Sequence, residues 1–270
     1  MLQAKVSTAL SVLARDGLRG VARTSFEKAG IWWREGEPID LGKLVGRPVP
    51  VARLDGCRFF LDAPEVSESL RYLLLSGKHE APERALAKRW VDTSLPLVEL
   101  GGSIGVVACV TNKSLLDSTR HVVVEANPKL IALLHRNRAV NGCQFTVRHC
   151  ALAYGDSVVR FHVAEQAISS SVHLPTTEVA VVPTTTLAAM LDEHAFDRCS
   201  VICDIEGAEM DLVEHEASVL ASRVAMLVLE IHPRKVGEEA VTRLRHRLRQ
   251  VGFEEVDRVW DTLALRNTTL

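Results

Sequence analysis

The chain has 270 residues, of which 47% are hydrophobic and 24% charged, which is typical of a globular protein and excludes a disordered or fibrous one. The charges of its 32 basic and 34 acidic residues nearly cancel, which argues against nucleic acid as a partner. No apolar run reaches the roughly 20 residues of a transmembrane helix, and the early apolar residues are spaced for a helix face rather than for a signal peptide. Six cysteines without a C-x-x-C pair predict reduced thiols in a cytoplasmic protein.

Residues 1–95 are predicted to form an extension of helices and one hairpin. Apolar residues at steps of three and four indicate an amphipathic helix over 1–29, which we expect to dock on the rest of the chain. Its basic face leaves a membrane surface or a partner open as alternatives. Alternating apolar residues around an Asp-Gly turn predict a hairpin over 49–61. The stretch 64–91 is predicted to be helical, with a break at Gly77.

Between residues 96 and 270, strands alternate with helices. This alternation predicts one doubly wound α/β domain whose mostly parallel sheet is covered on both faces. Its seven strands are expected over 97–100, 121–125, 144–149, 200–204, 225–231, 253–257 and 261–266. Its helices are expected over 104–116, 128–140, 208–220 and 235–250. An inserted β-ribbon is expected from 157–163 and 178–183. The last two strands are too closely connected for a parallel crossover, so the last strand is expected to be antiparallel.

A glycine-rich turn follows the first of these strands. Its small residues are Gly101, Gly102, Ser103 and Gly105. Glycines allow positive φ and the close approach of a ligand, and free amides at the start of a helix can face an electron-rich group. Glu125 ends the second strand, where a carboxylate can accept hydrogen bonds from ribose hydroxyls. The turn and the acid together predict a nucleoside-binding site.

The spacing of the glycines favours S-adenosylmethionine over a nicotinamide dinucleotide, because it does not reproduce G-x-G-x-x-G. Glu99, directly before the turn, would repel a pyrophosphate but attract a cationic amino-acid cofactor. A plain strand-to-helix turn with a surface glutamate would explain any one of three features, namely the glycine-rich turn, Glu99 and Glu125. It does not explain all three in this order.

The same turn also matches the G-x-S-x-G nucleophile elbow of α/β-hydrolases, with Ser103 as the nucleophile. Asp204 and His232 follow in the order that such a triad requires. However, the residues upstream lack the strand and helix units that precede this elbow, and the two glutamates would have no role. A serine esterase is therefore the alternative, beside a non-catalytic nucleoside-binding protein with the same fold.

These motifs resemble the FkbM family of methyltransferases over about 77–232. The matching segments are 98–105, Val124-Glu125-Ala126-Asn127-Pro128, 182–187, Cys203-Asp204-Ile205-Glu206-Gly207-Ala208-Glu209 and Glu230-Ile231-His232, with weaker similarity at 77–80 and 150–153. The D-x-E-G-x-E string of 204–209 is the most specific of them. Glu99, Gly102 and Ser103 stand where the family commonly has aspartate, alanine and asparagine.

The resemblance implies a class I methyltransferase fold and O-methyl transfer from S-adenosylmethionine. The implied acceptor is a small molecule, a hydroxyl of a sugar, glycolipid or natural product, and a homo-oligomer is left open. The residues expected to bind the cofactor are Glu99, Gly101, Gly102, Ser103, Gly105, Glu125, Ala126, Asn127, Ala151 and Asp204.

Methyl transfer requires a group that takes up the acceptor's proton. Asp204 ends the fourth strand, at the edge where ligands bind in doubly wound sheets. We expect His232, after the fifth strand, to be the base because an ordinary histidine pKa lies near neutrality, with Glu230 on the same strand face. Asp204 is the alternative base. Glu206 is expected to hold the acceptor or the cofactor's amino group, whereas for Glu209 a role at the helix dipole is equally well supported.

A divalent metal held by Asp204, Glu206, Glu230 and His232 is left open, and none is predicted. Further candidates for the acceptor pocket are His79, Glu80, Ser169, Ser170 and Ser171. Solvated loop positions explain the three serines better.

Overall fold

The computed structural model describes residues 51–163 and 178–270, which belong to two compact units that divide between Ala81 and Pro82. The amphipathic helix predicted over 1–29 lies outside the described residues, as do Ser169, Ser170 and Ser171. Helix α5 (Ala81–Trp90) is grouped almost entirely with the sheet. The division predicted at residue 95 stays a prediction.

The first unit contains the predicted hairpin. Strands β1 (Val51–Leu54) and β2 (Cys57–Phe60) pair antiparallel. Asp55-Gly56 between them has φ values of 48° and 84°, the left-handed pair that an Asp-Gly turn adopts readily. Helix α4 (Glu68–Ser76) ends at Gly77, whose φ of 76° is that of a left-handed C-cap. The break predicted at this glycine is therefore a helix end.

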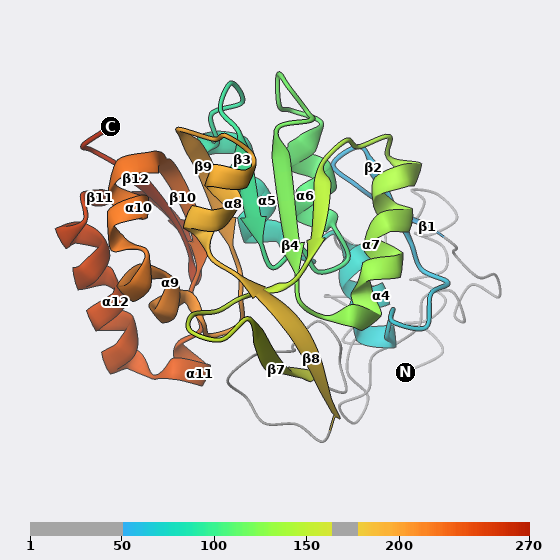
Figure 1. Ribbon diagram of the computed structural model, residues 1–270. Helices are drawn as coiled ribbons and strands as arrows, with labels where there is room; N and C mark the ends of the chain where they lie inside the picture. The colour runs from blue at the N-terminus through green and yellow to red at the C-terminus, as the bar shows by residue number, and fades with distance from the viewer. Residues whose placement is uncertain (1–50, 164–177) are drawn as a thin grey trace, which may run out of the picture. The chain divides into compact units, whose positions relative to one another are not determined.

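The second unit is built on a seven-stranded sheet with the order β11-β12-β10-β9-β3-β4-β5 (Figure 1). Its strands are β3 (Leu97–Leu100), β4 (His121–Glu125), β5 (Thr146–His149), β9 (Cys199–Cys203), β10 (Val224–Glu230), β11 (Phe253–Val259) and β12 (Thr262–Asn267). Neighbours among β3, β4, β5, β9 and β10 pair parallel, whereas β12 is antiparallel to both β10 and β11. The predicted doubly wound sheet with its antiparallel last strand is confirmed.

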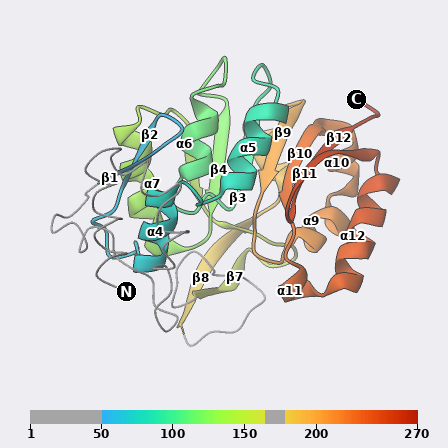
Figure 2. The ribbon, with the colours of Figure 1, turned by 180° about the vertical axis from the view of Figure 1, so that it is seen from behind.

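Helices cover both faces of this sheet (Figures 1 and 2). After α5 they are α6 (Val106–Asn112), α7 (Pro128–Val140), α8 (Leu187–Glu193), α9 (Glu209–His215), α10 (Ala217–Arg223), α11 (Pro233–Val236) and α12 (Glu238–Gln250). Helices α8, α9, α10 and α12 share a core with Val98 and Val201, while α5 and α6 pack around Leu97 and Ile202. Adjacent residues of one strand thus enter opposite cores, as expected for a strand buried on both faces.

Three elements differ from the prediction. The helix expected over 235–250 is divided into α11 and α12 by Gly237, whose φ is 85°. The helix expected over 208–220 likewise consists of α9 and α10. Helix α8 was not predicted, because its seven residues are too few for a clear period. Within the described residues, no helix is both long and apolar enough to cross a membrane. The six cysteines are all buried thiols.

The predicted ribbon is present as a separate small sheet. Strands β7 (Val158–Val163) and β8 (Glu178–Thr185) pair antiparallel, and a short β6 (Ala151–Leu152) joins β8 in parallel. Figure 1 shows β7 and β8 at the edge of the main sheet where α9 and α11 begin. The ribbon therefore lies near the carboxyl ends of the parallel strands.

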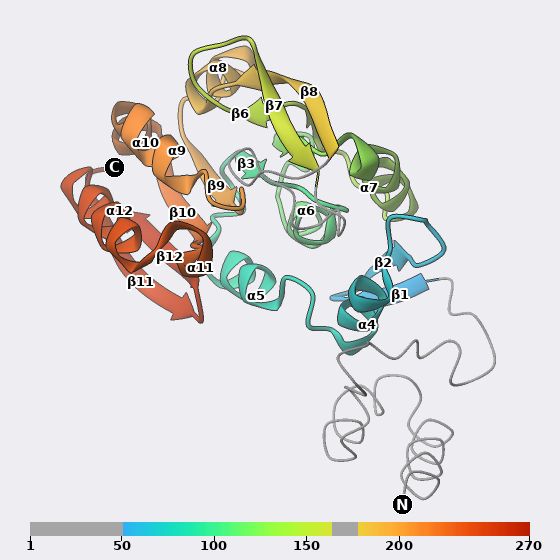
Figure 3. The same cartoon turned by 90° about the horizontal axis from the view of Figure 1, so that it is seen from below.

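These carboxyl ends meet at the edge that Figure 3 views directly. Strand β3 lies between β4 and β9, so the chain leaves β3 in one direction and later returns on its other side. Such a reversal of strand order is the switch point where ligands bind in doubly wound sheets. The Asp204 amide donates to the Leu100 carbonyl at 2.9 Å, which holds the segment after β9 against the end of β3.

Candidate active site

The glycine-rich turn is packed tightly against neighbouring strands. Gly101 has a φ of 88°, and a Cβ there would lie 1.7 Å from the carbonyl oxygen of Asp204. A Cβ at Gly102 would lie 2.3 Å from Val123 Cγ1, and one at Gly105 would lie 2.5 Å from a leucine of α7. Glycine is needed at position 101 because a backbone atom fills the space of a side chain, whereas at Gly102 and Gly105 neighbouring side chains would have to shift.

The amides of the turn mostly donate to protein atoms. Those of Gly101 and Gly102 both donate to the Val124 carbonyl, at 2.9 and 2.8 Å, and that of Ser103 donates to Glu125 Oε2 at 2.6 Å. From the sequence, free amides facing a ligand were expected here. At these three positions the amides donate to the end of β4 instead, because the tight turn brings them directly over the Val124 carbonyl and the Glu125 carboxylate.

Glu125 is fixed at the end of β4 by two backbone amides. Its Oε2 accepts the Ser103 N–H and its Oε1 accepts the Asn127 N–H, both at 2.6 Å. A carboxylate offers about four lone-pair positions, so each oxygen can accept a further hydrogen bond. The predicted ribose acceptor is thus held in one orientation.

Ser103 has an unusual environment for a serine. Its φ of 48° is left-handed, and its buried Oγ has no hydrogen-bond partner within 51–163 and 178–270. A buried hydroxyl left without a partner costs about 1–3 kcal/mol, which a polar ligand atom would recover. The nucleophile of an esterase would be hydrogen-bonded to its base. Ser103 makes no such bond to His232.

Glu99 faces the same side of the sheet as Glu125. It pairs in register with Val123, and residues two apart on a strand share a face. Its side chain is 3% exposed, and its Oε2 lies 3.8 Å from His121 Nε2. Burial lowers the pKa of His121 to about 3, so this histidine is uncharged near neutral pH and does not compensate the glutamate. A contact between Glu99 and the cofactor stays a prediction.

Three other predicted cofactor residues have evident packing roles. Asn127 caps α7, because its Oδ1 accepts the Lys129 N–H at 3.0 Å. Ala151 is buried in the ribbon's core, and Ala126 packs against the same cluster. Their contacts with a cofactor stay predictions.

His79 and Glu80 belong to the first unit. The His79 Nε2 atom lies 3.2 Å from Glu80 Oε1. Their predicted place beside the acceptor stays a prediction.

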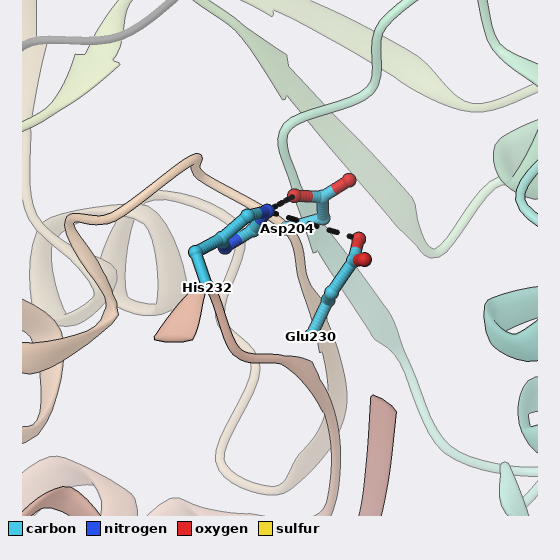
Figure 4. A group of neighbouring side chains, drawn as sticks. All are labelled: Asp204, Glu230 and His232. Carbon is cyan, nitrogen blue, oxygen red and sulfur yellow. Dashed lines mark ion pairs between the residues drawn. The ribbon is translucent and has the colours of Figure 1, made fainter. Parts of the chain in front are cut away.

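His232 lies among four carboxylates at the ends of β9 and β10. Its Nε2 is 3.1 Å from Glu206 Oε2, 3.4 Å from Asp204 Oδ1 and 4.0 Å from Glu230 Oε2. Its Nδ1 is 3.0 Å from Glu209 Oε1. Figure 4 shows the ring directed toward Asp204 and Glu230. The four residues predicted to act in catalysis thus converge, although they come from two strand ends.

Glu209 is the member of this cluster that the sequence analysis did not choose. Its side chain is 3% exposed, and its Oε1 also accepts the Gly207 N–H at 3.1 Å. The available signal was its position as the last acid of D-x-E-G-x-E. A helix-dipole role explained that position equally well, and only the fold brings it to His232.

The carboxylates change the protonation of the cluster. Burial lowers the pKa of His232, but its hydrogen bonds to Glu206 and Glu209 outweigh burial and raise the pKa to about 11. Burial, followed by the Glu230 carboxylate, raises the pKa of Asp204 well above its usual value. The expectation of a near-neutral pKa for His232 is therefore wrong, because the neighbouring acids stabilise its charged form.

Asp204, Glu230 and His232 also have the side-chain types of a metal site. Their ligand atoms all lie within 4.8 Å of one another. A metal needs a lone pair on the histidine nitrogen, whereas Nε2 here faces carboxylate oxygens that accept hydrogen bonds. The divalent metal that the sequence left open, without predicting one, stays open.

Comparison with known proteins matches a model of the methyltransferase FkbM domain to residues 99–265. No curated protein matches the chain. Among solved structures, an NADB-Rossmann superfamily protein from Streptococcus agalactiae is similar at 14% identity and a TM-score of 0.43, covering 70% of this chain and 68% of that one. Ribosomal protein L11 methylase from Lactobacillus delbrueckii subsp. bulgaricus has 12% identity, a TM-score of 0.42 and coverages of 70% and 77%. Aeropyrum pernix fibrillarin, solved with bound S-adenosyl-L-methionine, has 13% identity, a TM-score of 0.39 and coverages of 67% and 72%.

The family match spans more than half of the chain. It begins at Glu99, directly before the glycine-rich turn, and ends at Leu265 in β12. The turn, Glu125 and the whole carboxylate cluster around His232 therefore lie inside it. The chain belongs to the FkbM family of methyltransferases.

Proposed function

We propose that this methyltransferase moves a methyl group from S-adenosylmethionine to a hydroxyl of a sugar, glycolipid or natural product. Methyltransferases of this class generally use that cofactor. The observation that carries the proposal is the Glu125 carboxylate, fixed by two amides at the switch-point edge of the sheet. An acceptor for ribose hydroxyls is needed at that position by a nucleoside cofactor.

The residues at this edge fit the chemistry of the cofactor. Glu125 offers acceptors to hydroxyl donors, and the buried Ser103 Oγ offers a hydrogen bond that no described residue uses. Asp204, in the segment packed against Gly101, adds a carboxyl group whose ionised form is suited to a cation. When bound, S-adenosylmethionine supplies an electrophilic methyl group on a positively charged sulfur.

The chain's own contribution to the reaction is to orient the acceptor and to remove its proton. Asp204 and His232 are the groups of the carboxylate cluster that could take up this proton. Glu206 and Glu230, at 3.1 and 4.0 Å from His232 Nε2, can accept hydrogen bonds from other hydroxyls of the acceptor. A cluster rich in acceptors favours a polyhydroxylated substrate.

Transfer of a labelled methyl group tests the proposal. Purified protein is incubated with methyl-labelled S-adenosylmethionine and a panel of sugars, glycolipids and hydroxylated natural products. We expect an O-methyl ether as the product, and Asp204→Asn should slow its formation by about 100-fold or more. Glu214→Gln, an exposed change on α9, should react like the wild type. A product methylated on nitrogen or carbon, or no methyl transfer to any member of the panel, would contradict the proposal.

A further inference from the structure

The hydrogen bonds of His232 define its charge. Its Nδ1 faces Glu209 at 3.0 Å and its Nε2 faces Glu206 at 3.1 Å. An ionised carboxylate accepts hydrogen bonds and cannot donate them, so each ring nitrogen has to carry a hydrogen. A ring protonated on both nitrogens is an imidazolium and has no lone pair with which to accept another proton.

The two carboxylates are themselves anchored. Glu209 is buried and also accepts the Gly207 N–H at 3.1 Å. Glu206 contacts the Lys235 ammonium of α11 as well as His232. Both are therefore held in place independently of the histidine, and they form a preorganised clamp on its two sides.

The other charged groups around the ring reinforce this state. Asp204 follows β9, Glu230 ends β10, and Glu83 of α5 adds negative charge near Asp204. Lys235, a further cation, pairs with Glu206. A net excess of carboxylates favours a charged histidine.

Asp204 differs from the other acids of the cluster. Its Oδ1 is buried and has no hydrogen-bond partner in the described part of the chain. The 3.4 Å to His232 Nε2 is longer than a normal N–H···O bond. The lone pairs of Oδ1 therefore remain available, and the raised pKa of this carboxyl makes its ionised form a stronger base.

We propose that His232 is a positioning residue, a fixed cation that orders the carboxylates, and that Asp204 is the catalytic base. This inference rests on the proposed function, because it concerns the hydroxyl proton of an O-methyl transfer. In that step the acceptor oxygen bonds the methyl carbon and its O–H bond breaks. The proton goes to Asp204, and the electron pair of the broken carbon–sulfur bond stays on sulfur.

Charge-retaining and charge-removing variants separate a fixed cation from a base. His232→Lys keeps a cation and His232→Gln removes it. We expect His232→Gln to lose at least about 10-fold in kcat and His232→Lys to recover most of that loss, while Asp204→Asn loses about 100-fold or more. If His232 were the base, the lysine and glutamine variants would lose activity alike, and that result would overturn the inference.

A second readout needs neither substrate nor turnover. The ring of His232, observed by NMR in the cofactor-free wild type, should stay charged between pH 6 and 8 and titrate near pH 11, since its acids raise the pKa to about 11. Glu209→Gln should lower this midpoint, and the control Glu214→Gln should not change it. A wild-type midpoint near 6.5, or Mn²⁺ binding that requires His232, would overturn the inference. Absence of methyl transfer with a charged His232 would instead refute the proposed function and Asp204 as its base, and would leave only the fixed charge of His232 standing.

Discussion

Gly101 shows how a single residue couples the turn to the acid cluster. Its missing side chain leaves room for the Asp204 carbonyl, and its φ of 88° is one that residues with a Cβ rarely adopt. The first constraint is the steric contact with the Asp204 carbonyl, and the second is the backbone strain that a side chain would meet at this φ. The turn and the segment after β9 can therefore approach each other only through glycine.

Gly101→Ala should displace Asp204, because the new Cβ would lie 1.7 Å from a backbone oxygen that cannot rotate away. We expect a loss of more than about 1 kcal/mol in the free energy of unfolding together with weaker cofactor binding. Gly56→Ala is a matched control, with a φ of 84° and no atom within 4 Å. Urea unfolding and calorimetry would measure both effects. Equal losses in the two variants would mean that strain alone matters and that the contact with Asp204 does not.

At the scale of residues, the sequence predicted that Asp204, Glu206, Glu230 and His232 act together, because each ends a strand or lies within three residues of its end, at the edge where ligands bind. It could not reveal the protonation of His232. That property depends on Glu209, which reaches the ring from the first turn of α9. Distances between side chains of different elements set the pKa, and no local pattern encodes them.

At the scale of elements, α8 depends on a residue far along the chain. Glu216, between α9 and α10, is buried and accepts the N–H groups of Leu187 and Ala188, the latter at 3.1 Å. The Tyr154 hydroxyl donates to the same carboxylate at 3.3 Å. These bonds satisfy amides that the start of any helix leaves without intrahelical partners.

Glu216→Gln should destabilise the protein, because an amide group would place N–H donors opposite the N–H donors of α8. A buried polar group deprived of its partner costs about 1–3 kcal/mol. The exposed neighbour Glu214→Gln should change the free energy of unfolding by less than about 0.5 kcal/mol. Denaturant unfolding of both variants measures the difference. Equal stabilities would show that the carboxylate does not hold α8.

For two elements with strong local signals, β4 and α7, the predicted first and last residues are those of the structure. Strand β4 has three consecutive valines at its centre, and α7 begins with an Asn-Pro cap and first turn, so both ranges agree with the structure. Helix α8 has its signal only in Thr186, whose Oγ accepts the Ala189 N–H at 3.1 Å. Short elements of this kind are stabilised mainly by distant partners such as Glu216, which sequence periodicity does not register.

At the scale of the whole molecule, topology creates the candidate site. Strands β9 and β10 are neighbours and parallel, so the residues that follow them meet although 26 positions separate Asp204 from Glu230. The alternation of strands and helices was sufficient to predict a mostly parallel sheet, but not the order of its strands. The β6–β8 pairing was not predicted, because two-residue strands carry no pattern.

The proposed function requires a nucleoside pocket at the switch-point edge, with Glu125 as its ribose acceptor. Calorimetry with S-adenosylhomocysteine measures binding to this pocket directly for the wild type, Glu125→Gln and the control Glu214→Gln. The proposal predicts micromolar binding, about −8 kcal/mol, for the wild type and the control. It predicts at least about 10-fold weaker binding for Glu125→Gln, because an amide would oppose the Ser103 or Asn127 N–H. Wild-type protein that does not bind at millimolar ligand, or a Glu125→Gln variant that binds as tightly as the wild type, would contradict it.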